Sequence, residues 1–281
     1  MPGKILLLNC YIIHTMSFNG VKNADNFIKT REEQDIMREG GAILGNILLV
    51  LKKMLKPNLD TWELEKEFLV QCNKYGVEPS CKGYNPFKLS PFPTGLCLSI
   101  NSECVHCYPK KGKILKDGDT IVIDTAIKYK GLHLDSAFSS GIGKISSKDQ
   151  LFLHTAQRAL YNAINEVKPE IRIGKISNQI YKTVKKEGFD VLREYTGHGI
   201  GKEMHEWPQI LCYGGKNEGS KIKAGMTLCI ESLCCTGNPK VLNKSSWETE
   251  MADGGKFVQF EHTVLVTKDS YEILTLPSIT L

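Results

Sequence analysis

The sequence predicts an α+β fold, a single domain built from a duplicated unit. The first observation is that two helical periodicities followed by strand-like segments occur in residues 31–143 and again in residues 147–266. The second is that each unit ends in a hairpin pattern that carries acidic residues. The third is that no composition shift or linker separates the units. A chain of 281 residues with 41% hydrophobic content therefore fits one large core better than two independent domains.

The composition is that of an ordinary globular protein. The 36 basic and 31 acidic residues give a net charge of +5 without a concentrated basic patch, so we expect no direct nucleic-acid site. Ten cysteines without a secretory signal favour reduced thiols and a cytoplasmic location. The apolar run Ile5–Ile13 is too short to span a bilayer, so we expect no membrane segment there.

We interpret residues 1–29 as an N-terminal extension of unknown role and residues 30–281 as the folded domain. Met16 offers an alternative start within the extension. Organelle targeting stays open as a role for it, although the absence of Arg before Arg31 disfavours that role.

The first unit begins with two helices. Thr30 and Glu33 form a capping box, and apolar residues follow at helical spacing up to Pro57. A second helix is predicted from Asp60 to Gly76. Residues 79–95, rich in Pro, Gly, Ser and Asn, predict a long loop, which is often a functional feature in a compact domain.

A short strand at Leu96–Ile100 and a hairpin over Asp119–Phe138 complete the first unit. With Tyr129 and Lys130 at the tip, Asp124 lies directly opposite Asp135, with Cβ atoms about 5 Å apart. Two like charges in apolar strands are costly, and a metal ion or a shared proton would relieve the repulsion. A different register with both carboxylates in solvent is the alternative.

The second unit repeats the order of elements. Ser147–Gln150 is interpreted as another capping box that opens a helix through about Val167. The remaining predicted elements are a helix at Lys175–Glu187, strands near Arg193–Thr196 and Met226–Cys234, and a final hairpin from Trp247 to Val266 that turns at Asp253-Gly254.

Three further residues of the second unit suit metal binding. His198 lies between glycines, which allow a ligand to approach closely, while Glu231 and Glu261 lie in apolar strands where a carboxylate needs a partner. A structural histidine and buried salt bridges are the alternatives for each residue alone. Four carboxylates with one imidazole form a set that Mn, Fe, Co or Zn would accept, and the negative charge suits two ions.

The order Asp124, Asp135, His198 in GHGIG, Glu231 and Glu261 in FEHTVLV resembles the metal set of the methionine aminopeptidases, type I branch. The resemblance covers about residues 31–268. It implies the pita-bread fold, a pseudo-twofold unit with a central antiparallel sheet and outer helices. It also implies an enzyme with two divalent ions (Co, Mn, Fe or Zn), which we expect to be a cytoplasmic monomer. A hydroxide that bridges the ions would attack the first peptide bond and remove initiator methionine from nascent chains, with the ribosome as a further candidate partner.

The resemblance also assigns roles by position. His106 would contact the scissile-bond nitrogen, His205 would orient the substrate carbonyl, and Glu231 would be both a ligand and a proton shuttle. The methionine pocket would be lined by Cys81, Tyr84, Cys97, Met204 and Trp247.

Departures from the family pattern concern the residues beside the site. Cys107, Trp207 and Ser232 replace the usual residues, and the loop over residues 84–97 is longer than usual, so the substrate preference could shift. We assign no ligand role to His133 or to the pair Cys104 and Cys107. A proline-specific peptidase of the same fold and a non-catalytic binding protein are the rival functions.

Overall fold

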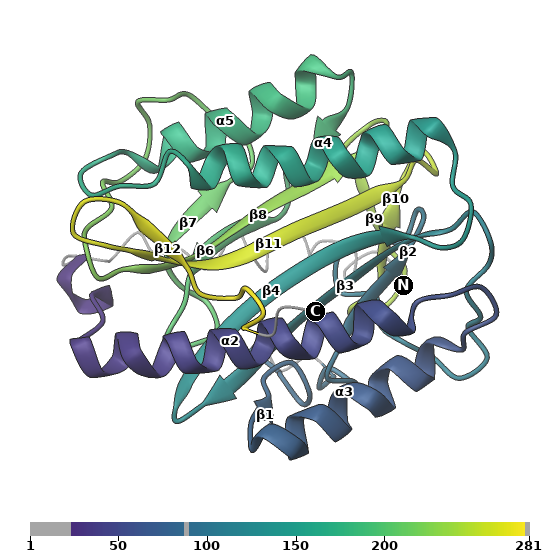
Figure 1. Cartoon of the computed structure of the whole chain (residues 1–281). Helices are drawn as coiled ribbons and strands as arrows, with labels where there is room; N and C mark the ends of the chain where they lie inside the picture. The colour runs from purple at the N-terminus through teal and green to yellow at the C-terminus, as the bar shows by residue number, and fades with distance from the viewer. Residues whose placement is uncertain (1–23, 87–89, 279–281) are drawn as a thin grey trace, which may run out of the picture.

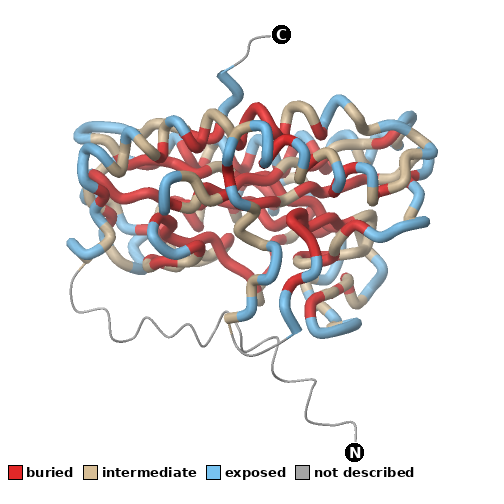
Figure 2. Tube along the Cα trace, turned by 90° about the horizontal axis from the view of Figure 1, so that it is seen from below, coloured by how far each residue is buried: buried red, intermediate tan, exposed pale blue. Residues whose placement is uncertain are grey.

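The protein is described by a computed structural model over residues 24–86 and 90–278. In these residues a ten-stranded antiparallel sheet is covered by two pairs of helices (Figure 1). The strands of the sheet are mostly buried, and the exposed residues lie at the periphery, on the helices and loops (Figure 2). No helix of this part of the chain is long and apolar enough to cross a membrane. The nine described cysteines are free thiols.

Capping residues define where α2 (Arg31–Met54) and α3 (Thr61–Tyr75) begin and where α3 ends. Thr30 and Glu33 form the predicted capping box of α2, and Asp60 caps α3, which ends at Gly76 in the left-handed conformation. The other two helices are α4 (Ser147–Ile164) and α5 (Ile173–Lys186).

The predicted start of α4 was wrong by one residue. The N-cap is Ser146, whose side chain accepts a hydrogen bond from the backbone N of Asp149, whereas Ser147 is already helical. Two serines in succession made the sequence ambiguous. The helix ends three residues earlier than predicted, and α5 begins two residues earlier, without a side-chain cap at Arg172.

The central strands are β3 (Thr120–Tyr129), β4 (Leu132–Gly141), β11 (Phe257–Val266) and β8 (Thr227–Cys235), side by side in that order. The flanking strands are β1 (Glu78–Pro79), β2 (Cys97–Ile100), β5 (Asp190–Val191), β6 (Thr196–Gly199), β7 (Glu206–Leu211) and β12 (Tyr271–Ile273). The strands predicted at Leu96–Ile100 and Met226–Cys234 correspond to β2 and β8. The one predicted at Arg193–Thr196 lies mostly before β6.

The duplication is visible in the topology. Each half contributes two helices and a pair of long strands, β3 with β4 and β8 with β11, and the halves join where β4 pairs with β11. Helix α2 packs against β3 and β4, while α4 packs against β8 and β11. Two hydrophobic cores lie under these helix pairs, one in each half. The expected pseudo-twofold α+β arrangement is therefore present.

The register of the first hairpin differs from the prediction. Tyr129 pairs with Leu132, so the turn residues are Lys130 and Gly131, with φ of 47° and 86°. Positive φ at both positions is what a two-residue type I′ turn requires. Asp124 consequently lies opposite Ala137, and Asp135 opposite Ala126. Because the shift moves each partner by two residues, both carboxylates still lie on one face of the sheet.

The predicted final hairpin was also wrong. The strand β10 (Thr249–Met251) pairs with β9 (Val241–Asn243) in a separate two-stranded sheet, while β11 pairs with β8 and β4. Asp253-Gly254 does form a turn, and the backbone N of Gly254 donates to the Met251 carbonyl oxygen. That turn joins β10 to β11, but the two strands do not pair, because β11 already pairs with β8 on one side and with β4 on the other.

Candidate metal centre

The predicted ligands lie in two neighbouring rows across the sheet. In the first row Glu261 of β11 pairs with Glu231 of β8 on one side and with Ala137 of β4 on the other, and Ala137 pairs with Asp124 of β3. Side chains of residues in register across antiparallel strands point to the same face. Three carboxylates from three strands therefore share one face.

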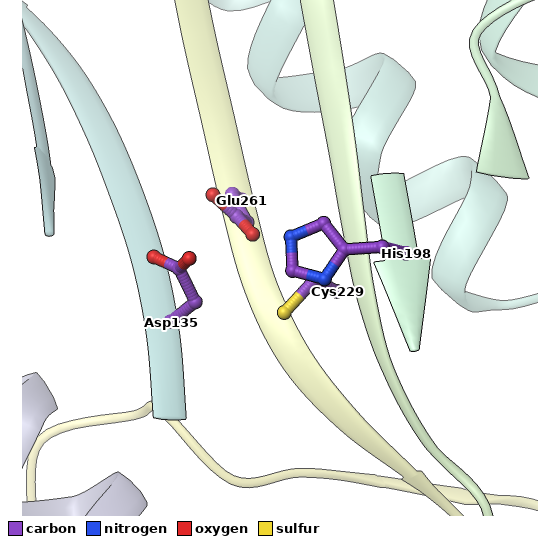
Figure 3. Close-up of side chains that lie close together, drawn as sticks. All are labelled: Asp135, His198, Cys229 and Glu261. Atoms are coloured by element: carbon purple, nitrogen blue, oxygen red, sulfur yellow. The ribbon is translucent and has the colours of Figure 1, made fainter. Parts of the chain in front are cut away.

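The second row adds Asp135 and His198. Asp135 lies two residues before Ala137 on β4, and His198 of β6 pairs with Cys229, which lies two residues before Glu231. Ligand atoms of Asp135, His198, Glu261 and Cys229 all lie within 4.8 Å of one another. Figure 3 shows the carboxylates of Asp135 and Glu261 and the ring of His198 directed toward a common centre.

Cys229 lies as close as the other three residues, but its side chain does not reach the cavity. Its side chain is fully buried and does not line the cavity, and its Sγ lies 3.7 Å from the hydroxyl of Thr263. Thr263 in turn donates to the backbone carbonyl oxygen of Asp135 and accepts from its backbone N. We therefore interpret Cys229 as part of the support beneath the centre.

Two oxygens of the centre show that the residues fit a bound cation. Among the described residues, Asp135 Oδ1 and Glu261 Oε1 are buried without a hydrogen-bond partner. A buried carboxylate oxygen without a partner is costly, and a divalent cation supplies the missing interaction. Four carboxylates and one imidazole are also donors that first-row divalent metals accept.

The electrostatics agree with that fit. Burial, reinforced by the neighbouring charge of Asp135, raises the pKa of Glu231 to about 8. Burial raises the pKa of Asp135 to about 6, and burial with the nearby carboxylates raises the pKa of Asp124 and Glu261 well above their usual range. Carboxylates held this close without a cation bind protons, so a divalent ion would have to displace those protons to restore the charge.

The tautomer of His198 follows from its contacts. Its Nδ1 lies 2.8 Å from the carbonyl oxygen of Gly199, which only accepts, so Nδ1 carries the proton and Nε2 is free to bind a cation. Burial lowers the pKa of His198 to about 4, which keeps the ring neutral. A Cβ at Gly197 would lie 2.5 Å from the carbonyl oxygen of Cys229, so close strand packing requires glycine there.

Gln259 is a member of the site that the sequence did not reveal. Its side chain is buried on β11, two residues before Glu261, and its Nε2 lies 3.3–3.4 Å from carboxylate oxygens of Asp124, Glu231 and Glu261. An amide donor at this place holds the carboxylates apart and oriented. The strand alternation marks Gln259 as facing the site, but only once the direction of Glu261 is known.

All twelve predicted site residues line one cavity, whose floor is the candidate metal centre. The predicted histidines and pocket residues at its wall are Cys81, Tyr84, Cys97, His106, Met204, His205 and Trp247. The sequence missed further lining residues, among them Phe92, Val105, Tyr195 and Gln209. Phe92 packs edge-on against Trp247 with ring centroids 5.3 Å apart. The indole N–H of Trp247 donates to the carbonyl oxygen of Ser90 at 2.7 Å, which fixes the long loop to this wall.

His205 is held in place from two sides. The hydroxyl of Tyr84 lies 3.0 Å from its Nδ1, and the ring of His198 lies 4.5 Å from its ring. Burial, with the adjacent imidazoles, lowers the pKa of His205, so it is neutral near pH 7. The hydroxyl of Tyr84 can donate to Nδ1 of His205, and in that tautomer the proton on Nε2 can be donated toward the cavity.

Of the three departures, two lie behind the site. Ser232, next to Glu231, points to the opposite face and donates to the carbonyl oxygen of Ala156 in α4. Cys107 is buried and donates to the carbonyl oxygen of Thr249. Trp207 packs against Phe27, with ring centroids 5.6 Å apart. None of the three lines the cavity, and residues 87–89 of the long loop lie outside the described residues.

Comparisons with known proteins agree with this architecture. Metallopeptidase family M24 matches residues 35–268. The chain is 41% identical to methionine aminopeptidase 1 of Bacillus subtilis over 248 residues, which cover 88% of this chain and 98% of the relative. It is 36% identical to the methionine aminopeptidase of Escherichia coli over 255 residues, which cover 89% and 93%.

Solved structures show the same similarity in three dimensions. The crystal structure of methionine aminopeptidase from Thermotoga maritima matches with a TM-score of 0.85 at 35% identity, over 89% of this chain and 98% of that one. Prolidase from Pyrococcus furiosus matches with a TM-score of 0.68 at 21% identity, over 90% and 66%, which shows the fold alone. The pita-bread fold is thereby confirmed, and the chain belongs to metallopeptidase family M24.

Proposed function

We propose that this chain is a methionine aminopeptidase whose centre holds two divalent ions through Asp124, Asp135, His198, Glu231 and Glu261. The observation that carries the proposal is the arrangement of these side chains on the floor of one cavity. Two of their oxygens, on Asp135 and Glu261, lack hydrogen-bond partners among the described residues. The names of the similar proteins support methionine as the N-terminal residue that is removed.

The ions would supply the nucleophile. Divalent ions held by these five side chains would lower the pKa of a bound water molecule, so that a hydroxide would be available near neutral pH. Mn, Fe, Co and Zn all accept a set of carboxylates and one imidazole, so the donor set does not distinguish among these metals. The remaining chemistry belongs to side chains of the chain.

Glu231 is the candidate proton carrier. It lies in register with Glu261 and within 3.3 Å of the Gln259 amide, which fixes the direction of its carboxylate. Burial places its pKa at about 8, in the range where a carboxylate can both accept and return a proton. It would take a proton from the attacking water and deliver it to the departing amine.

His205 and His106 would bind the peptide group. The N–H at Nε2 of His205 would donate to the substrate carbonyl oxygen, where negative charge develops. His106 packs edge-on against Trp247, with ring centroids 6.0 Å apart, and burial lowers its pKa to about 4. The low pKa values keep both rings neutral, so neither adds a positive charge beside a centre that would hold metal ions.

The cavity wall suits a methionine side chain. Cys81, Cys97 and Trp247 belong to one small hydrophobic cluster with Phe92 and Tyr84, and this cluster lines the cavity above the carboxylates. Sulfur and aromatic surfaces are polarizable and make favourable contacts with a thioether. The substrates would be nascent polypeptides that begin with methionine.

A proline-specific peptidase is the alternative, because prolidases share the fold. Hydrolysis of Met-Ala-Ser, Leu-Ala-Ser and Ala-Pro-Ser by metal-free protein titrated with Mn²⁺ or Co²⁺ distinguishes the two. We expect release of methionine that depends on added metal, with little cleavage of the other peptides. Preferred release of alanine from Ala-Pro-Ser would move the protein to the prolidases, and cleavage of none of them would favour a binding protein.

A further inference from the structure

The segment just before α2 packs against the turn that precedes β8. Ile28 forms a bridge with Met226, and the backbone N of Lys29 donates to the carbonyl oxygen of Gly225 at 2.8 Å. The amide of Gln34 in α2 donates to the carbonyl oxygen of Lys29, also at 2.8 Å. The backbone of Lys29 is therefore fixed at both of its polar groups.

The side chain of Lys29 forms a buried ion pair. Its Nζ lies 2.6 Å from Oε2 of Glu206, and the two side chains are 5% and 8% exposed. Nζ also donates to the carbonyl oxygen of Phe27, and Oε1 of Glu206 accepts from the backbone N of Glu203. A buried pair of this kind is strongly coupled, because removing one partner leaves an unpaired charge in the interior.

The loop between β6 and β7 is shaped around this lysine. A Cβ at Gly201 would overlap Cε of Lys29, and it would lie 2.5 Å from Nζ and 2.9 Å from Oε1 of Glu206. Gly201 is thus the residue that lets the loop close over the ion pair. Gly201, the last residue of the GHGIG motif, therefore makes room for the ion pair and not for the metal centre.

The pair lies directly behind two functional histidines. Glu206 is the first residue of β7 and pairs with Gly199, the neighbour of His198, in β6. His205, one residue earlier, lines the cavity, with its ring 4.5 Å from that of His198. Any movement of Glu206 would therefore move the backbone of His205.

We propose that Lys29 is a positioning residue for the reaction, which acts through Glu206 to fix the place of His205. The inference rests on the proposed function, since it assigns Lys29 to the substrate-orienting histidine of that reaction. The proposal also gives residues 24–29, at the N-terminal edge of the domain, a part in the function of the site. Lys29 and Glu206 are 177 positions apart in the sequence.

The chain offers a matched control on the same loop. Lys202 forms a pair with Glu33, with its Nζ 3.1 Å from Oε1, but its side chain is 76% exposed. Lys29→Met and Lys202→Met both remove one lysine charge from a Lys–Glu pair. We expect Lys29→Met to lower kcat for Met-Ala-Ser on the order of 10- to 100-fold, because a small displacement of a catalytic group has effects of that size. KM should stay within about twofold, and Lys29→Met should bind as many ions as the wild type. Lys202→Met should match the wild type, and Lys29→Arg should recover part of the loss.

A double-mutant cycle with His205→Ala separates positioning from general destabilisation. If Lys29 acts through His205, Lys29→Met causes no further loss of kcat in the His205→Ala background. Equal losses in both backgrounds, or wild-type kcat in Lys29→Met, would overturn the inference. Glu206→Gln keeps the side-chain shape and serves the same cycle if Lys29→Met does not fold. An inactive wild-type protein would refute the proposed function instead, so the two failures are distinct.

Discussion

Glu231 combines properties that a surface carboxylate lacks. It is buried, it lies in register with a second carboxylate on the neighbouring strand, and it is within reach of the Gln259 amide. Burial of such a carboxylate lowers the stability of a metal-free fold, and its presence is explained if it binds a ligand. The cost at Glu231 is thus a physical argument for function at this residue.

Replacing Glu231 with Gln removes the proton acceptor and keeps the shape. We expect turnover of Met-Ala-Ser to fall about 10²- to 10⁴-fold, the usual contribution of a positioned acid–base group, with an unchanged circular dichroism spectrum. Glu250→Gln on β10, which pairs with Lys244, is the matched control and should retain activity. Undiminished turnover in Glu231→Gln would refute the assigned role.

The raised pKa of Glu231 predicts how stability depends on pH. Its value moves from the ordinary 4.5 to about 8, so the metal-free fold binds this proton more tightly than the unfolded chain does. Stability from this group is complete below pH 4.5 and is lost as pH rises through 8. We therefore expect the Tm of metal-free protein to fall between pH 5 and pH 8, and added Mn²⁺ to raise Tm more at pH 8. An equal effect of Mn²⁺ at both pH values would contradict the prediction.

At the scale of elements, the caps define where the helices begin. Ser146 accepts a hydrogen bond from the backbone N of Asp149 and donates to its carboxylate, whereas Ser147 lies inside the helix. Ser146→Ala should cost about 1 kcal/mol of unfolding free energy, the usual loss for a capping serine. Ser147→Ala is the control and should be close to neutral. Urea denaturation midpoints measure both, and an equal cost in the two variants would contradict the assigned cap.

The strands show what sequence patterns can and cannot predict. The type I′ turn at Lys130-Gly131 shifted the predicted register, because a lysine with positive φ gives no signal in the sequence. The shift by two residues nevertheless kept Asp124 and Asp135 on one face, so the functional conclusion did not depend on it. The hairpin predicted at Asp253-Gly254 failed because a turn signal specifies a reversal of the chain but not which strands pair.

For the whole molecule, the two halves contribute different candidate ligands to one centre. Asp124 and Asp135 come from the first unit, and His198, Glu231 and Glu261 come from the second. The join between β4 and β11 places them side by side, so cation binding should hold the halves together. The duplicated pattern predicted two similar units, but it did not predict that β4 and β11 join them.

Other parts of the site required the folded chain. Lys29 and Glu206 are 177 positions apart, and neither has a local pattern that marks it as buried. Gln259 has no charge and no motif of its own. Such residues can be recognised only when distant segments are brought into contact, whereas the five candidate ligands were predicted from short motifs and strand patterns.

The measurement that tests the account most directly is the number of metal ions bound per chain, by native mass spectrometry in Mn²⁺ or Co²⁺. Asp124 and His198 lie at opposite ends of the centre, in β3 and β6. The account predicts two ions in the wild type and one in each of Asp124→Asn and His198→Ala. A wild-type chain that is active on Met-Ala-Ser with no more than one ion, or variants that keep both ions, would contradict it.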